Sequence, residues 1–186
     1  MTTHHAGDNI PYTVTFLEMT ERPAYDWPHT PSAMTGALLK ADAPPVWYFR
    51  ALYDAVGRDY AWTDLHDSED TEIGDWLADS KVALYSLIDK GWPHGFFLLD
   101  WRAGATCELC YFGLVPGVVG RGFGSWMLRT AILTGWAQEG VEKMIVNTCT
   151  LDHPRALIQY QRHGFEVVRR EDRTRTLTRD WTPTKD

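Results

Sequence analysis

Three glycines alternate with other residues at Gly120, Gly122 and Gly124, directly before a run of apolar residues at helical spacing. Glycine has no Cβ, so its backbone can adopt positive φ and can come close to a bulky group. The first amides of a helix have no partner inside the helix and lie at the positive end of its dipole. Together these features predict a cradle for an anionic group, most often a phosphate.

Two common phosphate-binding motifs do not match this loop. No G-K-[ST] follows the glycines, which excludes a Walker loop. The dinucleotide-binding fingerprint needs G-x-G-x-x-G, and here the third glycine comes one position early. A dinucleotide-dependent oxidoreductase stays open as an alternative, because Glu139 and Glu142 lie near the expected place of a ribose-binding acid. The hairpins expected before the loop are the wrong context for it.

The elements that position the loop follow from the hydrophobic pattern along the chain. Helices are expected at 46–57, at about 124–139 and at 152–164, with a short acidic helix capped by Asp70 or Thr71. Residues 26–45 are expected to form a long loop. Strands are expected at 12–20, 81–89, 94–102, 106–115 and 141–151, and residues 165–171 and 174–178 are expected to close the chain as a strand pair. This order predicts a mixed α/β domain whose antiparallel meander leads into a strand–helix–strand–helix unit.

Length and composition limit the class of protein. A chain of 186 residues with 44% hydrophobic residues suits one folded domain, expected at 11–180, with flexible tails at 1–10 and 181–186. The net charge of −7 disfavours a nucleic-acid partner. No apolar run is long enough to span a bilayer, and the first residues lack the pattern of a signal peptide. The expected location is therefore cytoplasmic, with no membrane partner.

The cysteines do not predict a metal or redox site. Cys107 and Cys110 form a C-x-x-C, but the surrounding residues form a strand pattern, in which positions i and i+3 point to opposite faces. Two thiols on opposite faces cannot chelate one ion, and no second Cys/His pair with ligand spacing follows. No bound metal is expected.

The glycine loop resembles the acetyl-CoA-binding loop of the GNAT acetyltransferases. In that family a V-x-P-like turn is followed by [Q/R]-x-x-G-x-[G/A]. Here Pro116 lies at the turn, and Gly122 and Gly124 occupy the two small positions. Val119 stands where the family has glutamine or arginine, and Arg121 is a candidate to supply the missing charge.

A second stretch resembles the same family. Its last helix reads N-x-x-A-x-x-x-Y-x-x-x-G-F, and Ala156, Tyr160, Gly164 and Phe165 fall in register. His153 replaces the asparagine. The resemblance covers about residues 81–168. The sequence NTCTLDHPRAL is similar to a bacterial branch of the family.

The resemblance implies a GNAT fold: a central, mostly antiparallel sheet of six to seven strands, splayed between the fourth and fifth strands and flanked by about four helices. The splayed strands would be 106–115 and 143–151, with pantetheine between them. The resemblance implies acetyl-CoA as cosubstrate. Its expected contacts are Leu114, Val115, Val119, Gly120, Arg121, Gly122, Phe123, Gly124, Ser125, Asn147, His153 and Tyr160.

Acetyl transfer to an amine requires a base, because an amine with a pKa near ~10 is mostly protonated at neutral pH. Glu108 is the candidate, since it occupies the position of a catalytic glutamate in many GNAT enzymes. Alternation is expected to place it on one face with Cys110, Phe112 and Leu114, where apolar surroundings would raise its pKa. Asp100 and Glu72 are the alternative bases.

Tyr160 is the candidate acid for the departing thiolate, because the matching tyrosine of the family lies near the CoA sulfur. A backbone N–H near Leu114 is the expected oxyanion donor. Trp47, Arg50 and Tyr53 lie where the family builds acceptor pockets, and together with Glu108 they are the expected substrate contacts. The expected acceptor is a small-molecule amine. A non-catalytic acyl-CoA-binding or regulatory domain and a protein acetyltransferase remain alternatives, and the resemblance allows for a homodimer.

Overall fold

The computed structural model describes residues 3–183. One seven-stranded sheet carries four α-helices and two short 3₁₀ helices. The elements in chain order are β1 (Asn9–Met19), β2 (Ala37–Lys40), α1 (Val46–Gly57), η1 (Arg58–Tyr60), α2 (Asp70–Ala78), β3 (Val82–Asp89), β4 (Trp92–Asp100), β5 (Thr106–Leu114), η2 (Pro116–Val118), α3 (Phe123–Ala137), β6 (Lys143–Cys149), α4 (Ala156–Arg162) and β7 (Glu166–Thr176). The expected mixed α/β class and mostly antiparallel sheet are confirmed.

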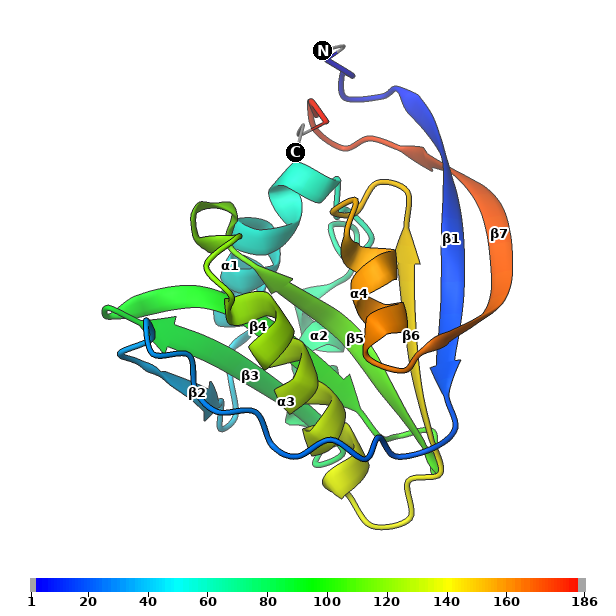
Figure 1. Ribbon diagram of the computed structural model, residues 1–186. Helices are drawn as coiled ribbons and strands as arrows, with labels where there is room; N and C mark the ends of the chain where they lie inside the picture. Colours follow the sequence, from blue (N-terminus) through cyan, green and yellow to red (C-terminus); the bar gives the residue numbers. More distant parts are fainter. Residues whose placement is uncertain (1–2, 184–186) are drawn as a thin grey trace.

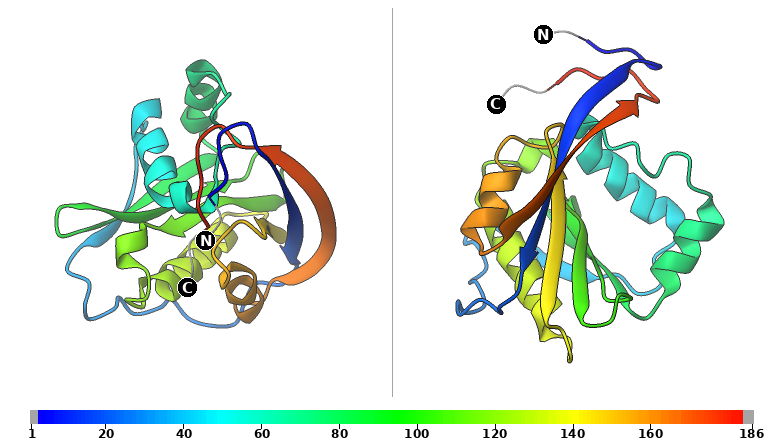
Figure 2. Two further views of the ribbon diagram at one scale, coloured as in Figure 1. Left: turned by 90° about the horizontal axis from the view of Figure 1, so that it is seen from above. Right: turned by 90° about the vertical axis from the view of Figure 1, so that its right-hand side faces the viewer.

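The sheet runs in the order β2-β3-β4-β5-β6-β1-β7. Every neighbouring pair among the described strands is antiparallel except β5 and β6, which are parallel. Helices α3 and α4 lie on one side of the sheet, and α1 and α2 lie on the other (Figures 1 and 2). The chain therefore has three layers, and the first strand lies inside the second half of the sheet.

Each face of the sheet has its own core. Phe123, Met127 and Ala131 of α3 pack on one face. Phe49 of α1 and Ile73 of α2 pack on the other. Burial of these apolar side chains is the main force that holds the helices on the sheet. Together the two cores fix the central strands from both sides.

Strand β5 contains a β-bulge at Cys110. Leu98 of β4 pairs with Tyr111, and the next residue, Leu99, pairs with Leu109, so Cys110 has no partner opposite it. A bulge shifts the alternation of side chains by one residue. The strand therefore presents different faces before and after Cys110.

The bulge corrects the expected face of β5. Glu108 pairs with Asp100, which contacts Trp76 on the α1/α2 side, whereas Phe112 and Leu114 pack in the α3 core. Glu108 and Phe112 therefore do not share a face, because the bulge lies between them. The two thiols still separate as expected: Cys107 is in the α3 core, and Cys110 packs against the opposite one.

The end of the chain is one strand, where two were expected. Residues 166–176 form β7, which pairs with β1 along almost its whole length. The polar residues 171–173 resemble a turn in sequence, but their side chains find partners across the strands. Asp172 accepts a hydrogen bond from Thr13 at 2.7 Å, and the Arg173 guanidinium lies over the Phe16 ring.

Three further expectations need correction. The expected loop at 26–45 contains the edge strand β2, which pairs with β3. The N-cap of α2 is Glu69, without a side-chain capping bond. The expected tails are shorter in the described residues, since β1 begins at Asn9 and the backbones of His4 and Trp181 form an isolated β-bridge. Residues 1–2 and 184–186 lie outside the description.

Candidate active site

The site lies where β5 and β6 separate. The two strands pair in parallel from Thr106 to Glu108 on β5 and from Lys143 to Ile145 on β6, and beyond this point no ladder joins them. A cavity of about 700 Å³ occupies the gap and is lined by both strands. The expected splay between these two strands is therefore present.

The glycine loop forms one end of the cavity. Gly120 and Gly122 have φ of 86° and 82°, in the left-handed region that favours glycine. A Cβ at either position would meet no atom within 4 Å, so both backbones are open on that side. Gly122 is the N-cap of α3 and provides no side-chain capping bond. The first amides of the helix are therefore not capped by a side chain and suit an anionic group.

Not every residue expected to contact the cofactor lines this cavity. The expected residues that line it are Leu114, Val119, Gly120, Gly122, Gly124, Ser125, Asn147, His153 and Tyr160. Arg121 is exposed, and its charge acts on His94. Phe123 is only 2% exposed and packs in the α3 core. The Val115 amide donates to the His94 carbonyl at 2.9 Å. These three side chains lie outside the cavity wall.

Glu108 lies in the cavity wall and is half-buried. Burial raises the pKa of its carboxyl, and the negative charge of Asp100 raises it further, against an opposing effect of Arg102. Among the described residues, no cation lies within 4 Å of the carboxylate, and no hydrogen bond occupies it. A carboxylate with these properties is free to accept a proton from a ligand.

Asp100 has a different environment. Arg102 forms an ion pair with it at 2.8 Å, and the Trp76 indole donates to it at 2.8 Å. Burial acts to raise the pKa of Asp100, but the hydrogen bonds from Arg102 and Trp76 and the Arg102 charge together outweigh it, and the pKa is lowered. Asp100 is therefore an ionised carboxylate beside Glu108, and its oxygens are already bonded to Arg102 and Trp76. The other alternative base, Glu72, is exposed on α2 and does not line the cavity.

The pair of carboxylates gives a pH prediction. A base at Glu108, as the family resemblance implies, must be ionised to act, so we expect the rate to fall as pH drops through its raised pKa. In Asp100→Asn the neighbouring negative charge is lost, the pKa of Glu108 falls, and the acid limb of the kcat/KM profile moves to lower pH. Steady-state rates across pH measure the limb. Glu72→Gln is the control, with an unmoved limb; an unmoved limb in Asp100→Asn would contradict the coupling.

Tyr160 of α4 reaches the cavity from the other side. Its side chain is 7% exposed, and its ring contacts Phe112 and Phe165 edge-on. Burial raises the pKa of its hydroxyl, and the nearby Asp152 carboxylate raises it further. The hydroxyl stays protonated at neutral pH and is a donor. No hydrogen bond engages it within residues 3–183.

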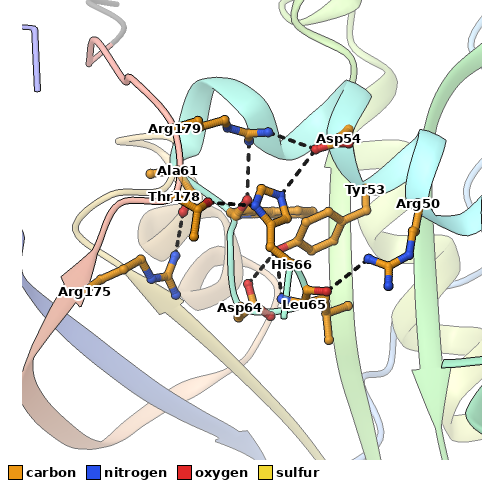
Figure 3. Close-up of polar contacts among 11 residues, drawn as sticks. Arg50, Tyr53, Asp54, Ala61, Asp64, Leu65, His66, Arg175, Thr178 and Arg179 are labelled. Atoms are coloured by element: carbon orange, nitrogen blue, oxygen red, sulfur yellow. Dashed lines mark hydrogen bonds and ion pairs between the residues drawn. The ribbon is translucent and has the colours of Figure 1, made fainter. Parts of the chain in front are cut away.

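Of the four expected substrate contacts, Glu108 lines the cavity, and the other three lie behind its wall. Trp47 is 70% exposed on the outer side of α1. The Arg50 guanidinium donates to Asp70 and to the carbonyls of Leu65 and Ser68. The Tyr53 hydroxyl donates to Asp64 at 2.7 Å (Figure 3). None of the three expected side chains lines the cavity, and Arg50 and Tyr53 instead hold the 61–68 segment in place.

The wall also contains residues that were not among the expected contacts. On the α1/α2 side they are Trp62, Asp64, Trp76 and Tyr111, and from β1 and β7 they are Tyr12, Val14, Phe16, Arg173 and Arg175. The two-residue spacing within 12–16 and 173–175 was a usable signal of a shared face. Which face meets the cavity depends on the partner strands, which local sequence does not reveal.

Two further properties of the described chain bear on its chemistry. Residues 3–183 contain no group of three or more His, Cys, Asp or Glu side chains placed to hold a metal ion. None of the helices within that range has the length and apolar character needed to cross a membrane.

Comparison with known proteins identifies the family. The model of the Acetyltransferase (GNAT) family matches residues 21–165. The chain belongs to this family, which confirms the resemblance and supports acyltransferase activity. The dinucleotide-binding alternative is not supported. No curated protein sequence matches the chain.

Solved structures share the fold at low identity. A GCN5-related N-acetyltransferase from Sphaerobacter thermophilus is 16% identical with a TM-score of 0.63, over 98% of this chain and 55% of that one. A second from Kribbella flavida is 17% identical with a TM-score of 0.56, over 83% and 54%. An aminoglycoside acetyltransferase from an uncultured soil metagenomic sample is 12% identical with a TM-score of 0.55, over 68% and 86%. The chain thus spans little more than half of the first two.

Proposed function

We propose that this protein is an acetyl-CoA-dependent N-acetyltransferase that moves an acetyl group directly to a primary amine of a small molecule. The observation that carries the proposal is one continuous cavity between the splayed strands. It is lined by the glycine loop, by an unpaired carboxylate at Glu108 and by a protonated phenol at Tyr160. Cradle, base and acid are the parts that this reaction needs.

The residues present fit acetyl-CoA. The open backbones of Gly120 and Gly122 and the first amides of α3 would hold its pyrophosphate. The pantetheine amides would lie in the gap beyond the parallel pairing of β5 and β6. Acetyl-CoA supplies an activated acetyl group as a thioester.

Three groups of the chain then act as base, oxyanion donor and acid. Glu108 removes a proton from the acceptor ammonium, directly or through a water molecule. A backbone amide near Leu114 stabilises the oxyanion that develops, and the Val115 amide is excluded because it already donates to His94. Tyr160 donates a proton to the departing thiolate. Cytoplasmic location and a homodimer stay predictions from the sequence.

The experiment that tests this function measures release of the CoA thiol from acetyl-CoA in the presence of a panel of primary amines. Mass spectrometry identifies the acetylated product. Amine-dependent thiol release with an acetylated amine supports transfer. Tight acetyl-CoA binding without transfer to any amine would favour the non-catalytic acyl-CoA-binding alternative.

Tyr160→Phe tests the acid. The phenyl ring keeps the contacts to Phe112 and Phe165 and removes only the hydroxyl, so the melting temperature should stay close to that of the wild type. We expect kcat to fall by roughly 10- to 100-fold, at or below the lower end for general acid catalysis. The loss should shrink with an acyl donor whose leaving thiol has a lower pKa. An unchanged kcat would remove Tyr160 from the reaction.

A further inference from the structure

His163, the C-cap of α4, is a buried polar residue that the proposed reaction does not use. It is 9% exposed, its Nδ1 lies 2.7 Å from the Gln159 carbonyl oxygen, and its Nε2 lies 3.2 Å from the Ser125 hydroxyl oxygen. A carbonyl oxygen only accepts hydrogen bonds, so Nδ1 must carry a proton. In neutral His163 the other nitrogen, Nε2, is therefore unprotonated and accepts a hydrogen bond from Ser125.

Ser125 connects this ring to the glycine loop. It lies in the first turn of α3, and it lines the same cavity as Gly120, Gly122 and Gly124. Its side chain carries the one hydroxyl of residues 116–125. A phosphate group on the first amides of α3 would therefore lie beside the Ser125 side chain.

The Ser125 hydroxyl has a single proton to donate. While neutral His163 accepts that proton, the hydroxyl oxygen has only lone pairs to offer a phosphate, which is itself an acceptor. When His163 gains a proton, its Nε2–H donates to the Ser125 oxygen, and the hydroxyl proton is free to turn to the phosphate. A hydrogen bond in which one partner is charged is stronger than one between neutral groups. The protonation state of His163 thus decides whether Ser125 can donate to the ligand.

The groups bonded to His163 bring no negative charge. Within residues 3–183, no carboxylate lies within 4 Å of its ring nitrogens. The Tyr25 hydroxyl donates to the His163 carbonyl at 3.5 Å, and the Arg129 guanidinium lies 4.6 Å from the centre of the Tyr25 ring. Burial raises the pKa of Tyr25 to about 12, against the opposing charge of Arg129, so this phenol is neutral. An anionic ligand would therefore be the counter-charge of a protonated His163.

We propose that His163 is a positioning residue for acetyl-CoA, protonated in the complex, which acts through Ser125 to direct the hydroxyl proton to the diphosphate. This inference rests on the proposed binding of acetyl-CoA and adds a residue that falls at an unspecified position of the family motif. The complex then holds one proton more than the free protein. Acetyl-CoA binding should therefore tighten as pH falls through the range in which histidine changes its charge, about pH 8 to 5.

The test measures acetyl-CoA binding by calorimetry at pH 8 and at pH 6. One linked proton changes the affinity by at most about tenfold per pH unit, and for the wild type we expect a Kd at least about fivefold lower at pH 6. Titrations at pH 7 in two buffers with different ionisation enthalpies should show net proton uptake. The 3′-phosphate of CoA also titrates near pH ~6. Its contribution is common to all variants, so each variant is compared with the wild type at the same pH.

Two substitutions separate this role from a merely structural bond. Ser125→Ala has no hydroxyl, so its Kd should lie at or above the wild-type pH 8 value at both pH values. In His163→Gln the side-chain amide can donate to Ser125 at any pH, so the Kd should lie near the wild-type pH 6 value at both. Neither variant should take up the extra proton. Melting temperatures show whether each variant is folded, and either folded variant alone tests the proposal.

His66 provides a matched control. Its Nδ1 also lies close to a hydroxyl, that of Thr178 at 2.8 Å, but neither residue lines the cavity (Figure 3). His66→Gln should therefore keep the pH dependence and the proton uptake of the wild type.

The other outcomes count against the proposal. A pH dependence that is the same in the wild type and in both variants would show that the bond between His163 and Ser125 only holds α4 on α3. A dependence that survives Ser125→Ala but not His163→Gln would show that His163 acts without Ser125, and its loss in His66→Gln would assign it to another histidine. Absence of acetyl-CoA binding at every pH would instead remove the proposed function on which the inference rests.

Discussion

Glu108→Gln should abolish most of the acetyl-transfer activity while leaving acetyl-CoA binding intact. Glutamine has nearly the same shape as glutamate, but its amide cannot accept a proton from the acceptor ammonium. We expect kcat to fall by roughly 100- to 10,000-fold, the range for loss of a general acid or base. Steady-state thiol release and calorimetric titration with acetyl-CoA measure the two effects separately.

The position of Glu108 explains why one substitution has so large an effect. The other carboxylates of the wall are engaged: Asp100 by Arg102, Asp64 by two tyrosines, and Asp152 by three donors. No second carboxylate is therefore available to replace it. Glu72→Gln, outside the cavity, is the control and should keep the wild-type rate. A Glu108→Gln enzyme within about threefold of the wild-type kcat would show that Glu108 is not the base.

Gly122→Val should remove acetyl-CoA binding. Gly122 has φ of 82°, and a left-handed conformation costs a residue with a Cβ roughly 1–2 kcal/mol, more for a β-branched one. The valine would drive the backbone out of this conformation and turn the first amides of α3 away from the cavity. We expect the Kd for acetyl-CoA to rise by at least about 30-fold, or about 2 kcal/mol.

Gly117→Val is the matched control for this prediction. Gly117 is not among the glycines with positive φ, a Cβ there meets no atom within 4 Å, and it does not line the cavity. This variant should bind acetyl-CoA as the wild type does. A folded Gly122→Val protein, with a melting temperature and circular dichroism like those of Gly117→Val, and an unchanged Kd would show that the glycine loop does not form the cradle.

The elements that sequence predicts well are those with a clear local period. The helix expected at 46–57 is α1 residue for residue, and the three strands of the meander match β3, β4 and β5 within two residues. Their hydrophobic patterns are long and are bounded by glycine or turn residues, so local information is sufficient.

The elements that sequence misses depend on partners elsewhere in the chain. The four residues of β2 have no pattern of their own and become a strand through pairing with β3. β7 continues through the polar residues 171–173 because β1 lies beside it. The bulge at Cys110 arises from the register between β4 and β5, and it reverses the face of every later residue of β5.

The site residues also divide into those that a local motif predicts and those that depend on distant parts of the chain. The family motifs identified the glycine loop, Glu108 and Tyr160, and the structure brings all three to one cavity. The expected substrate contact Tyr53 does not line the cavity. It lies behind the wall and donates a hydrogen bond to Asp64, which does line the cavity. Local sequence could not predict that Arg175 lines the cavity, because β7 comes to the 61–66 segment only in the folded chain.

The most direct test of the account is a thermal-shift titration with acetyl-CoA, CoA and NAD in parallel. A ligand that binds only the folded state stabilises it by about 2.7 kcal/mol at 100 times its Kd. For a chain of this length that corresponds to a rise of roughly 5–10 °C in the melting temperature. We predict this rise with acetyl-CoA and with CoA, none with NAD, and its loss in Gly122→Val. No shift with either CoA compound would contradict the central claim that the cavity between β5 and β6 binds acetyl-CoA.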